Sequence, residues 1–245
     1  MAERDTALYR HRGSWFLPLL AVALIIFQRP ATTWADLRAG HDRDQGVCDP
    51  LADYFLGMED YPEAIKRHLA VIHEHPDNAL AHYHLGFAYG VIGDHRREMA
   101  EYQKAVDLGL SDWELFLNLG LLDMETGHLD AAGELLRLAA LMGPYRPETH
   151  FNLGLVYERQ GMFQKAEQEL LLSLRLDPHQ VDARNMLGVI YADEGNFQRA
   201  HEEWTDLVNT NPDFTPARAN LAILNRIERG EIKGPDRLSG FAHAP

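Results

Sequence analysis

Apolar residues recur along most of this chain at the spacing of one side of a helix. A clear example is formed by two short runs: Leu153, Val156 and Tyr157, then Phe163, Ala166 and Leu170. Gly161 lies between them, and a glycine there can take the left-handed backbone conformation that ends a helix. The pattern therefore predicts two amphipathic helices joined by a tight turn.

This helical unit repeats every 34 residues, from near Gln45 onward, without a gap or an insertion. Its most regular mark is a Leu-Gly pair, which begins at Leu85, Leu119, Leu153 and Leu187. The same spacing reaches Leu51-Ala52 upstream and Leu221-Ala222 downstream. A spacing this strict marks an array of repeats, with units at 45–78, 79–112, 113–146, 147–180 and 181–214.

Four further positions follow the same frame. They are a turn glycine (Gly93, Gly127, Gly161, Gly195), a small alanine (Ala64, Ala132, Ala166, Ala200), a bulky residue (Tyr102, Leu136, Leu170, Trp204) and a proline (Pro76, Pro144, Pro178, Pro212). Glycine after the leucine, with alanine opposite, lets two helix backbones cross closely, although glycine costs a helix about 1 kcal/mol relative to alanine. The proline ends the second helix because it has no amide hydrogen to donate.

These residues together resemble the tetratricopeptide repeat, over about residues 45–228. Single units depart from the pattern, with Glu59 at a turn-glycine position, Glu98 for the alanine, Leu110 for the proline and Asp123 for an aromatic residue. The resemblance implies an all-α fold, a right-handed alpha-solenoid of about five tandem helix-turn-helix units. A polar helix near 215–228, with Arg218, Asn220, Asn225, Arg226 and Glu228, is expected to cap the last open face.

Residues 1–35 differ in kind from the repeats. The run from Trp15 to Phe27 is apolar and only 13 residues long, which is short for a membrane span of about 20 residues but suits a secretory leader. Thr33 and Ala35 predict cleavage after Ala35, whereas an uncleaved single-pass anchor and a peripheral hydrophobic start remain alternatives. A leader and an anchor would both place the repeats beyond the cytoplasmic membrane, in the periplasm or tethered to its outer face.

The other parts of the chain are short. Residues 36–44 are expected to be a linker, and residues 229–245, with scattered glycine and proline, a disordered tail. Cys48 is the only cysteine, so no internal disulfide can form. It lies 21 residues after Phe27, too far from the apolar run for a lipid-modified cysteine.

Charge and motifs narrow the function classes. The formal net charge of −14 argues against a nucleic-acid partner, because phosphates require clustered lysine and arginine. The sequence lacks a phosphate-binding glycine loop, a nucleophile elbow and a zinc-binding His-Glu-x-x-His helix. We therefore expect neither an enzyme nor a cofactor.

Five histidines, His68, His73, His75, His82 and His84, fall within seventeen residues. His82 and His84 are two positions apart on one predicted helix, so their side chains point to different faces. The sequence therefore predicts surface and inter-helix histidines and no metal site.

The resemblance implies that the first helix of each unit lines a concave groove. Its fifth and ninth positions would form a largely apolar floor, which consists of Tyr83, Phe87, Leu117, Leu121, Phe151, Leu155, Asn185 and Val189. Its sixth position would add His84, Asn118 and Asn152, and its second position an acidic edge of Glu114, Glu148 and Asp182. The alternative is that the apolar residues pack on the next repeat and the acids are a solvated face.

The expected function is a non-enzymatic protein–protein interaction scaffold in an envelope assembly complex, exported or membrane-tethered. Such a groove suits a basic peptide or amphipathic helix of another protein, with asparagine amides bonding its backbone. Two alternatives are a regulator that recruits an enzyme without a groove ligand and a metal-binding protein that uses the histidines.

Overall fold

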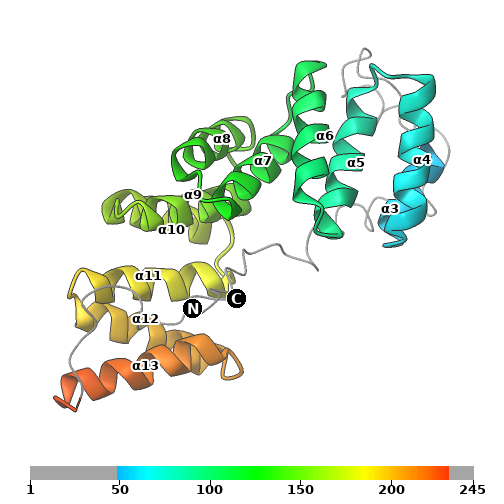
Figure 1. Cartoon of the computed structure of the whole chain (residues 1–245). Coiled ribbons are helices and arrows are strands. Elements are labelled where there is room, and N and C mark those ends of the chain that lie inside the picture. Colours follow the sequence, from blue (N-terminus) through cyan, green and yellow to red (C-terminus); the bar gives the residue numbers. More distant parts are fainter. Residues whose placement is uncertain (1–48, 232–245) are drawn as a thin grey trace, which may run out of the picture. The chain divides into compact units, whose positions relative to one another are not determined.

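The computed structural model describes residues 49–231, and within this range every regular element is a helix (Figure 1). The helices are α3 (Pro50–Gly57), α4 (Tyr61–Glu74), α5 (Ala79–Val91), α6 (His95–Asp107), α7 (Trp113–Glu125), α8 (Leu129–Met142), α9 (Pro147–Arg159), α10 (Phe163–Leu176), α11 (Val181–Asp193), α12 (Phe197–Thr210) and α13 (Thr215–Glu228). Their order gives five helix pairs followed by α13. The prediction of an all-α solenoid of repeats is confirmed.

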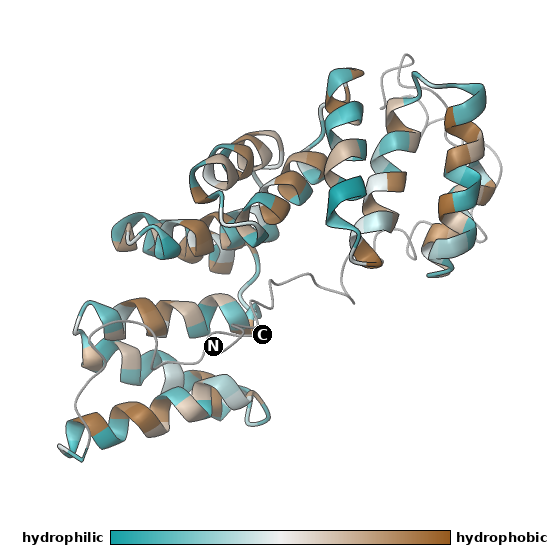
Figure 2. Ribbon diagram, viewed as in Figure 1, coloured by the Kyte–Doolittle hydropathy of each residue, from teal (hydrophilic) through white to brown (hydrophobic). Residues whose placement is uncertain are grey.

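The chain forms two compact units, which divide after Leu122. In the first unit α3, α4, α5 and α6 pack on one another in chain order, and in the second unit α8 to α13 do the same. Figure 2 shows apolar and polar residues alternating along the helices, as expected for amphipathic segments.

Side-chain caps determine where several helices begin. The side chain of Asp60 accepts a hydrogen bond from the backbone N–H of Glu63, that of Asn78 from Ala81, and that of Asp94 from Arg97. Each cap satisfies one of the free amide groups of a helix start, which is worth about 1 kcal/mol.

The turn glycines take the conformation that the sequence predicts. Gly93, Gly127, Gly161 and Gly195 have φ between 73° and 84°. In the first unit Glu59 occupies this position with φ 60°, so the same turn forms there with a residue that favours it less.

The second repeat ends its second helix without a proline. Gly109, just after α6, has φ 91°, and its N–H bonds to the carbonyl of Val106. The N–H of Leu110 bonds to the carbonyl of Ala105. This glycine-based ending performs the task of the missing proline.

The helix crossings are as close as the glycines suggested. A methyl group added at Gly86 would lie 2.6 Å from the Tyr102 ring, and one at Gly188 only 2.4 Å from the Trp204 indole. At Gly154 it would meet Leu170 at 2.9 Å. In these three repeats the bulky residue of the second helix therefore packs directly on the backbone of the first helix.

In the second repeat, Glu98 departs from the repeat pattern, and an additional glycine, Gly90, makes room for it. Glu98 replaces the small alanine and is 1% exposed, and a methyl group at Gly90 would lie 2.4 Å from its carboxylate. His95 Nδ1 lies 2.9 Å from the same carboxylate. A second glycine in α5 thus makes room for a buried acid.

The closing helix α13 differs in one residue from the prediction. Arg218, Arg226 and Glu228 are exposed, as a polar cap requires. Asn220 is fully buried and donates a 3.1 Å hydrogen bond to Oδ1 of Asn185 in α11. It belongs to the packing of α13 on the stack.

Two glycine-to-alanine substitutions in the second unit test the crossing. We expect Gly188→Ala to lower the free energy of unfolding by about 1–3 kcal/mol, since Trp204 is fully buried and its Nε1–H bonds to the carbonyl of Asn185. Gly133→Ala is the control, because its methyl group would meet only Val156 at 3.5 Å. Urea titration should show that the control is unchanged or more stable, by up to about 1 kcal/mol. Equal effects of both changes would contradict the crossing argument.

Candidate functional site

A hydrogen-bonded, partly exposed group on the first helices of the repeats spans α5 and α7. The hydroxyl of Tyr83 donates a 3.4 Å hydrogen bond to Oε2 of Glu114, and Nδ2 of Asn118 donates one of the same length to the Tyr83 oxygen. All three side chains are partly exposed. Phe87 lies one turn after Tyr83 and is also partly exposed. We refer to Tyr83, Phe87, Glu114 and Asn118 as the inner-helix patch.

Neighbouring rings hold the patch in place. The ring centroid of Tyr83 lies 5.8 Å from that of Tyr102 and 5.5 Å from that of His84. Phe87 packs on the core formed by Leu56, Ala64 and Ala88. Desolvation, together with the Glu114 carboxylate, raises the pKa of the Tyr83 hydroxyl well above its usual range, so the hydroxyl remains a donor.

The structure divides the fourteen residues expected to line the groove into two classes. Those that are partly exposed are Tyr83, His84, Phe87, Glu114, Asn118, Glu148 and Leu155. Those that are buried are Leu117, Leu121, Phe151, Asn152, Asp182, Asn185 and Val189. The burial of these seven residues fits packing between repeats better than it fits the floor of an open groove.

The buried residues have partners within the protein. Phe151 and Val189 belong to one apolar cluster with Met186. Nδ2 of Asn152 donates a 2.8 Å hydrogen bond to the carbonyl of Glu148, one turn earlier. Asn220 likewise bonds to Asn185. These asparagine side chains therefore form hydrogen bonds within the protein.

His82 has a structural role that recurs in the fourth repeat. Its Nδ1 lies 2.6 Å from Glu101, and its Nε2 lies 3.2 Å from the carbonyl of Pro76. His150 makes the equivalent contacts with Glu169 and Pro144, at 2.8 and 3.2 Å. In its own repeat, each of these histidines links the second helix to the turn that precedes the first helix.

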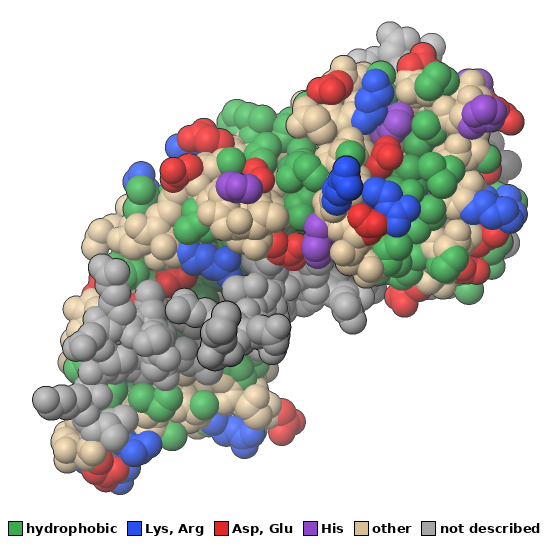
Figure 3. Space-filling view, in the orientation of Figure 1, with side chains coloured by type: hydrophobic (Ala, Val, Ile, Leu, Met, Phe, Trp, Pro, Cys, Tyr) green, Lys and Arg blue, Asp and Glu red, His purple; other side chains and the backbone are tan. Residues whose placement is uncertain are grey.

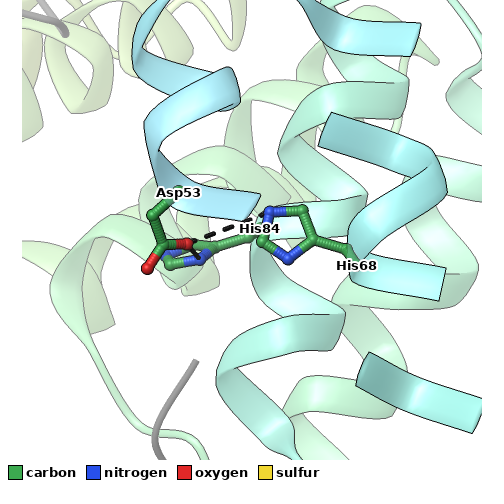
Figure 4. Close-up of side chains that lie close together, drawn as sticks. All are labelled: Asp53, His68 and His84. Atoms are coloured by element: carbon green, nitrogen blue, oxygen red, sulfur yellow. Dashed lines mark ion pairs between the residues drawn. The ribbon is translucent and has the colours of Figure 1, made fainter. Parts of the chain in front are cut away.

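His84 has other partners than His82, as the helical spacing predicts, and lies next to two residues of the first repeat (Figure 4). Its Nδ1 lies 2.7 Å from Oδ1 of Asp53, and its ring centroid lies 5.4 Å from that of His68. His68 is fully buried, and burial, with a smaller effect of His84, lowers its pKa to about 4. Sequence reasoning missed Asp53, although an acid at the ninth position of its repeat was a visible signal.

A second titratable group lies buried on α9. Glu158 is 5% exposed, and its burial raises its pKa to about 7, with a smaller contribution from Asp193. In the unfolded chain this carboxyl has its ordinary pKa of 4.5. The folded protein therefore holds the proton more tightly, and this group destabilises the fold as the pH rises from about 4.5 through 7.

We expect Glu158→Gln to stabilise the protein at pH 8, because it removes a carboxylate that must be buried in its charged form. The gain is at most about 3 kcal/mol, should be much smaller at pH 5, and should vanish below about pH 4, where both states hold the proton. Thermal unfolding at pH 5 and pH 8 measures it, with exposed Glu202→Gln as the control. A gain of equal size at both pH values would exclude this origin.

On the face that Figure 3 shows, charged and histidine side chains are interspersed among hydrophobic ones over the helices of the first unit. Between residues 49 and 231, none of the helices is both long enough and apolar enough to cross a membrane. The predicted leader or anchor at 1–35, the linker at 36–44 and Cys48 lie outside the described residues, as does all of the predicted tail beyond residue 231.

Comparison with known families agrees with the geometry. Models of the tetratricopeptide repeat match residues 50–112 and residues 147–180. No curated protein matches the sequence.

Several solved structures share the fold. YrrB, described as a tetratricopeptide-repeat protein with an unusual peptide-binding site, is 23% identical, with a TM-score of 0.63 over 68% of this chain and 86% of its own. MamA is 22% identical, with a TM-score of 0.61 over 66% of this chain and 95% of its own. PilF of Pseudomonas aeruginosa is 21% identical, with a TM-score of 0.63 over 74% of this chain and 82% of its own. At these identities the likeness establishes the fold.

Proposed function

Because this chain is a tetratricopeptide-repeat protein, we propose that it is a scaffold that holds a basic peptide or amphipathic helix of another protein on its inner-helix patch. Such repeats bind other proteins and are generally non-enzymatic. The observation that carries the proposal is the hydrogen-bonded group of Tyr83, Glu114 and Asn118, which lies partly exposed on adjacent first helices.

The chemistry of the patch favours a partner that is both apolar and basic. Tyr83 and Phe87 offer aromatic surface, which often anchors an interface. Glu114 offers a carboxylate to lysine or arginine, and the amide of Asn118 can bond to a peptide backbone. The net charge of −14 would also attract a basic partner over a distance.

Other findings agree with this function. The solved structure of YrrB, which has this fold, is described as having a peptide-binding site. In the second unit Glu148 and Leu155 are partly exposed on α9, so the first helices there also offer an acidic and an apolar position. Each unit by itself thus offers contact residues on its first helices: the inner-helix patch in the first unit, and Glu148 and Leu155 in the second.

Conservative substitutions on the intact chain test the patch. Synthetic amphipathic helices that carry lysine on one side, and matched helices that carry glutamate, would be titrated by fluorescence anisotropy. We expect the chain to bind the lysine helices more tightly than the glutamate helices. Glu114→Gln and Tyr83→Phe should each lower the affinity for the lysine helices by about 10-fold, and added salt should lower it further. Tyr145→Ala is the control, since Tyr145 is 82% exposed outside the first helices. Equal binding of both helix types, or no effect of Glu114→Gln, would count against the proposal.

We also propose that the repeats lie outside the cytoplasm, exported by residues 1–35 or tethered by them, and serve an envelope assembly complex. The support is the apolar run from Trp15 to Phe27, with Arg10 and Arg12 before it and the small residues near Ala35 after it. Sequencing the amino terminus of protein from native membranes distinguishes the two forms. We expect Asp36 for a cleaved leader and Met1 for an anchor, whereas recovery in the cytoplasmic fraction would exclude export.

One observation favours the alternative of a regulator that recruits an enzyme without a groove ligand. The end of α8 and the turn after it expose four large apolar side chains: Leu138, Leu141, Met142 and Tyr145. Exposed groups of this kind often mark contact sites. In that case Tyr145→Ala would lose the partner that cross-links in native membranes, and Glu114→Gln would keep it.

A further inference from the structure

Three consecutive helices bring Asp53, His68 and His84 together. Asp53 lies on α3, His68 on α4 and His84 on α5, so each helix supplies one side chain (Figure 4). Each residue offers one ligand atom, and the three atoms lie within 4.8 Å of one another. Oδ1 of Asp53 lies 2.7 Å from Nδ1 of His84 and 3.9 Å from Nε2 of His68.

Comparison of equivalent positions in the repeats shows that this grouping occurs only at the first junction, where the first repeat meets the second. Asp53 is at the ninth position of its unit, where later units have Phe87, Leu121, Leu155 and Val189. His68 is at the bulky position, where the later units have Tyr102, Leu136, Leu170 and Trp204. His84 is at the sixth position, where the later units have Asn118, Asn152 and Met186. Only the first junction carries metal-ligand types at all three positions.

From this grouping we propose that Asp53, His68 and His84 bind a divalent transition-metal ion, and that Zn²⁺ is the ion that suits them best. Two imidazoles and one carboxylate are a common ligand set for zinc, with water in the fourth position. Zinc bonds of about 2.0–2.2 Å place the ligand atoms of a tetrahedral site about 3.3 Å apart, so the side chains need to shift by about 1 Å or less on average.

Burial favours a specific site over loose surface binding. His68 is fully buried, and Asp53 and His84 are partly exposed, so the ion would be held against the protein with one side open to water. The exposed pair His73 and His75 lies at the end of α4 and is not part of this group. Neutral imidazoles and a carboxylate suit zinc better than magnesium or calcium, which prefer oxygen ligands.

The ion would tie the first described helix to the next two. α3 has only eight residues, and among them just Ala52 and Leu56 are buried. An ion bound to the folded state alone stabilises it in proportion to the logarithm of its concentration over the dissociation constant. Metal binding would therefore fix α3 on α4 and α5 beside the inner-helix patch.

The test uses the full chain without a purification tag, after removal of metal by a chelator. Zinc binding would be measured by competition with a chromophoric chelator, and Co²⁺ would report the ligand geometry by its visible absorption. We expect one ion per chain, a visible Co²⁺ band and a rise in the unfolding temperature with zinc.

Four variants assign the site. We expect His84→Gln, Asp53→Asn and His68→Leu each to weaken zinc binding by at least about 10-fold and to remove the Co²⁺ band. His68→Leu places in the first unit the residue that the third and fourth units have at that position, so the metal-free protein should still fold. His82→Gln is the matched control on the same helix, because His82 bonds to Glu101 and Pro76 instead, and it should bind zinc like the unchanged protein.

Three results would overturn the proposal. They are the absence of stoichiometric zinc binding by the unchanged chain, normal binding in His84→Gln and Asp53→Asn, and loss of binding only in a His73→Gln/His75→Gln variant. None of these variants changes Tyr83 or Glu114, so failure of the metal site and failure of the peptide patch remain distinguishable.

Discussion

The fold depends on one contact that recurs in the second, fourth and fifth repeats: a bulky side chain of the second helix packs on the bare backbone of the first. At Gly86, Gly154 and Gly188 the missing side chain leaves just enough room for the ring or leucine opposite. Since protein interiors are packed as densely as crystals, this contact fixes the separation of the two helices. The pairs then stack because no pair can bury its apolar side alone. The position of every groove residue follows from this stacking.

The same constraint explains why the first junction is different. There the pair of residues at the crossing is Ala52 and His68, both fully buried, in place of glycine and a large apolar residue. An imidazole at a position that the fold buries costs free energy unless its polar atoms have partners. Asp53 and His84 are within reach of His68 because the adjacent first helices α3 and α5 pack beside α4. The repeat geometry thus places a carboxylate and a buried imidazole where the later units have apolar or aromatic side chains.

Much of the fold could be predicted because its determinants are local. Turn glycines, helix-ending prolines and side-chain caps act within a few residues, and the period of 34 fixes their spacing. Exposure of the groove could not be predicted, because it depends on neighbouring helices: Tyr83 and Phe151 share the fifth position, yet one is partly exposed and the other is 3% exposed. Reasoning on a helical wheel correctly separated His82 from His84. A helical wheel could not predict the cluster of Asp53, His68 and His84, because these residues come from three different helices.

Polar residues at positions that the repeat buries are therefore informative in this chain. Glu98 fits because Gly90 makes room and His95 lies beside it, and Asn185 fits because it accepts a hydrogen bond from Asn220. Glu98, Asn185 and Asn220 are all buried, so these side chains have no side open to a ligand. The carboxylate of Asp53, in contrast, is partly exposed and lies between two imidazoles, one fully buried and one partly exposed. A group that is ordered by the fold and open on one side has the two properties that binding a small ion requires, and the buried pairs have only the first.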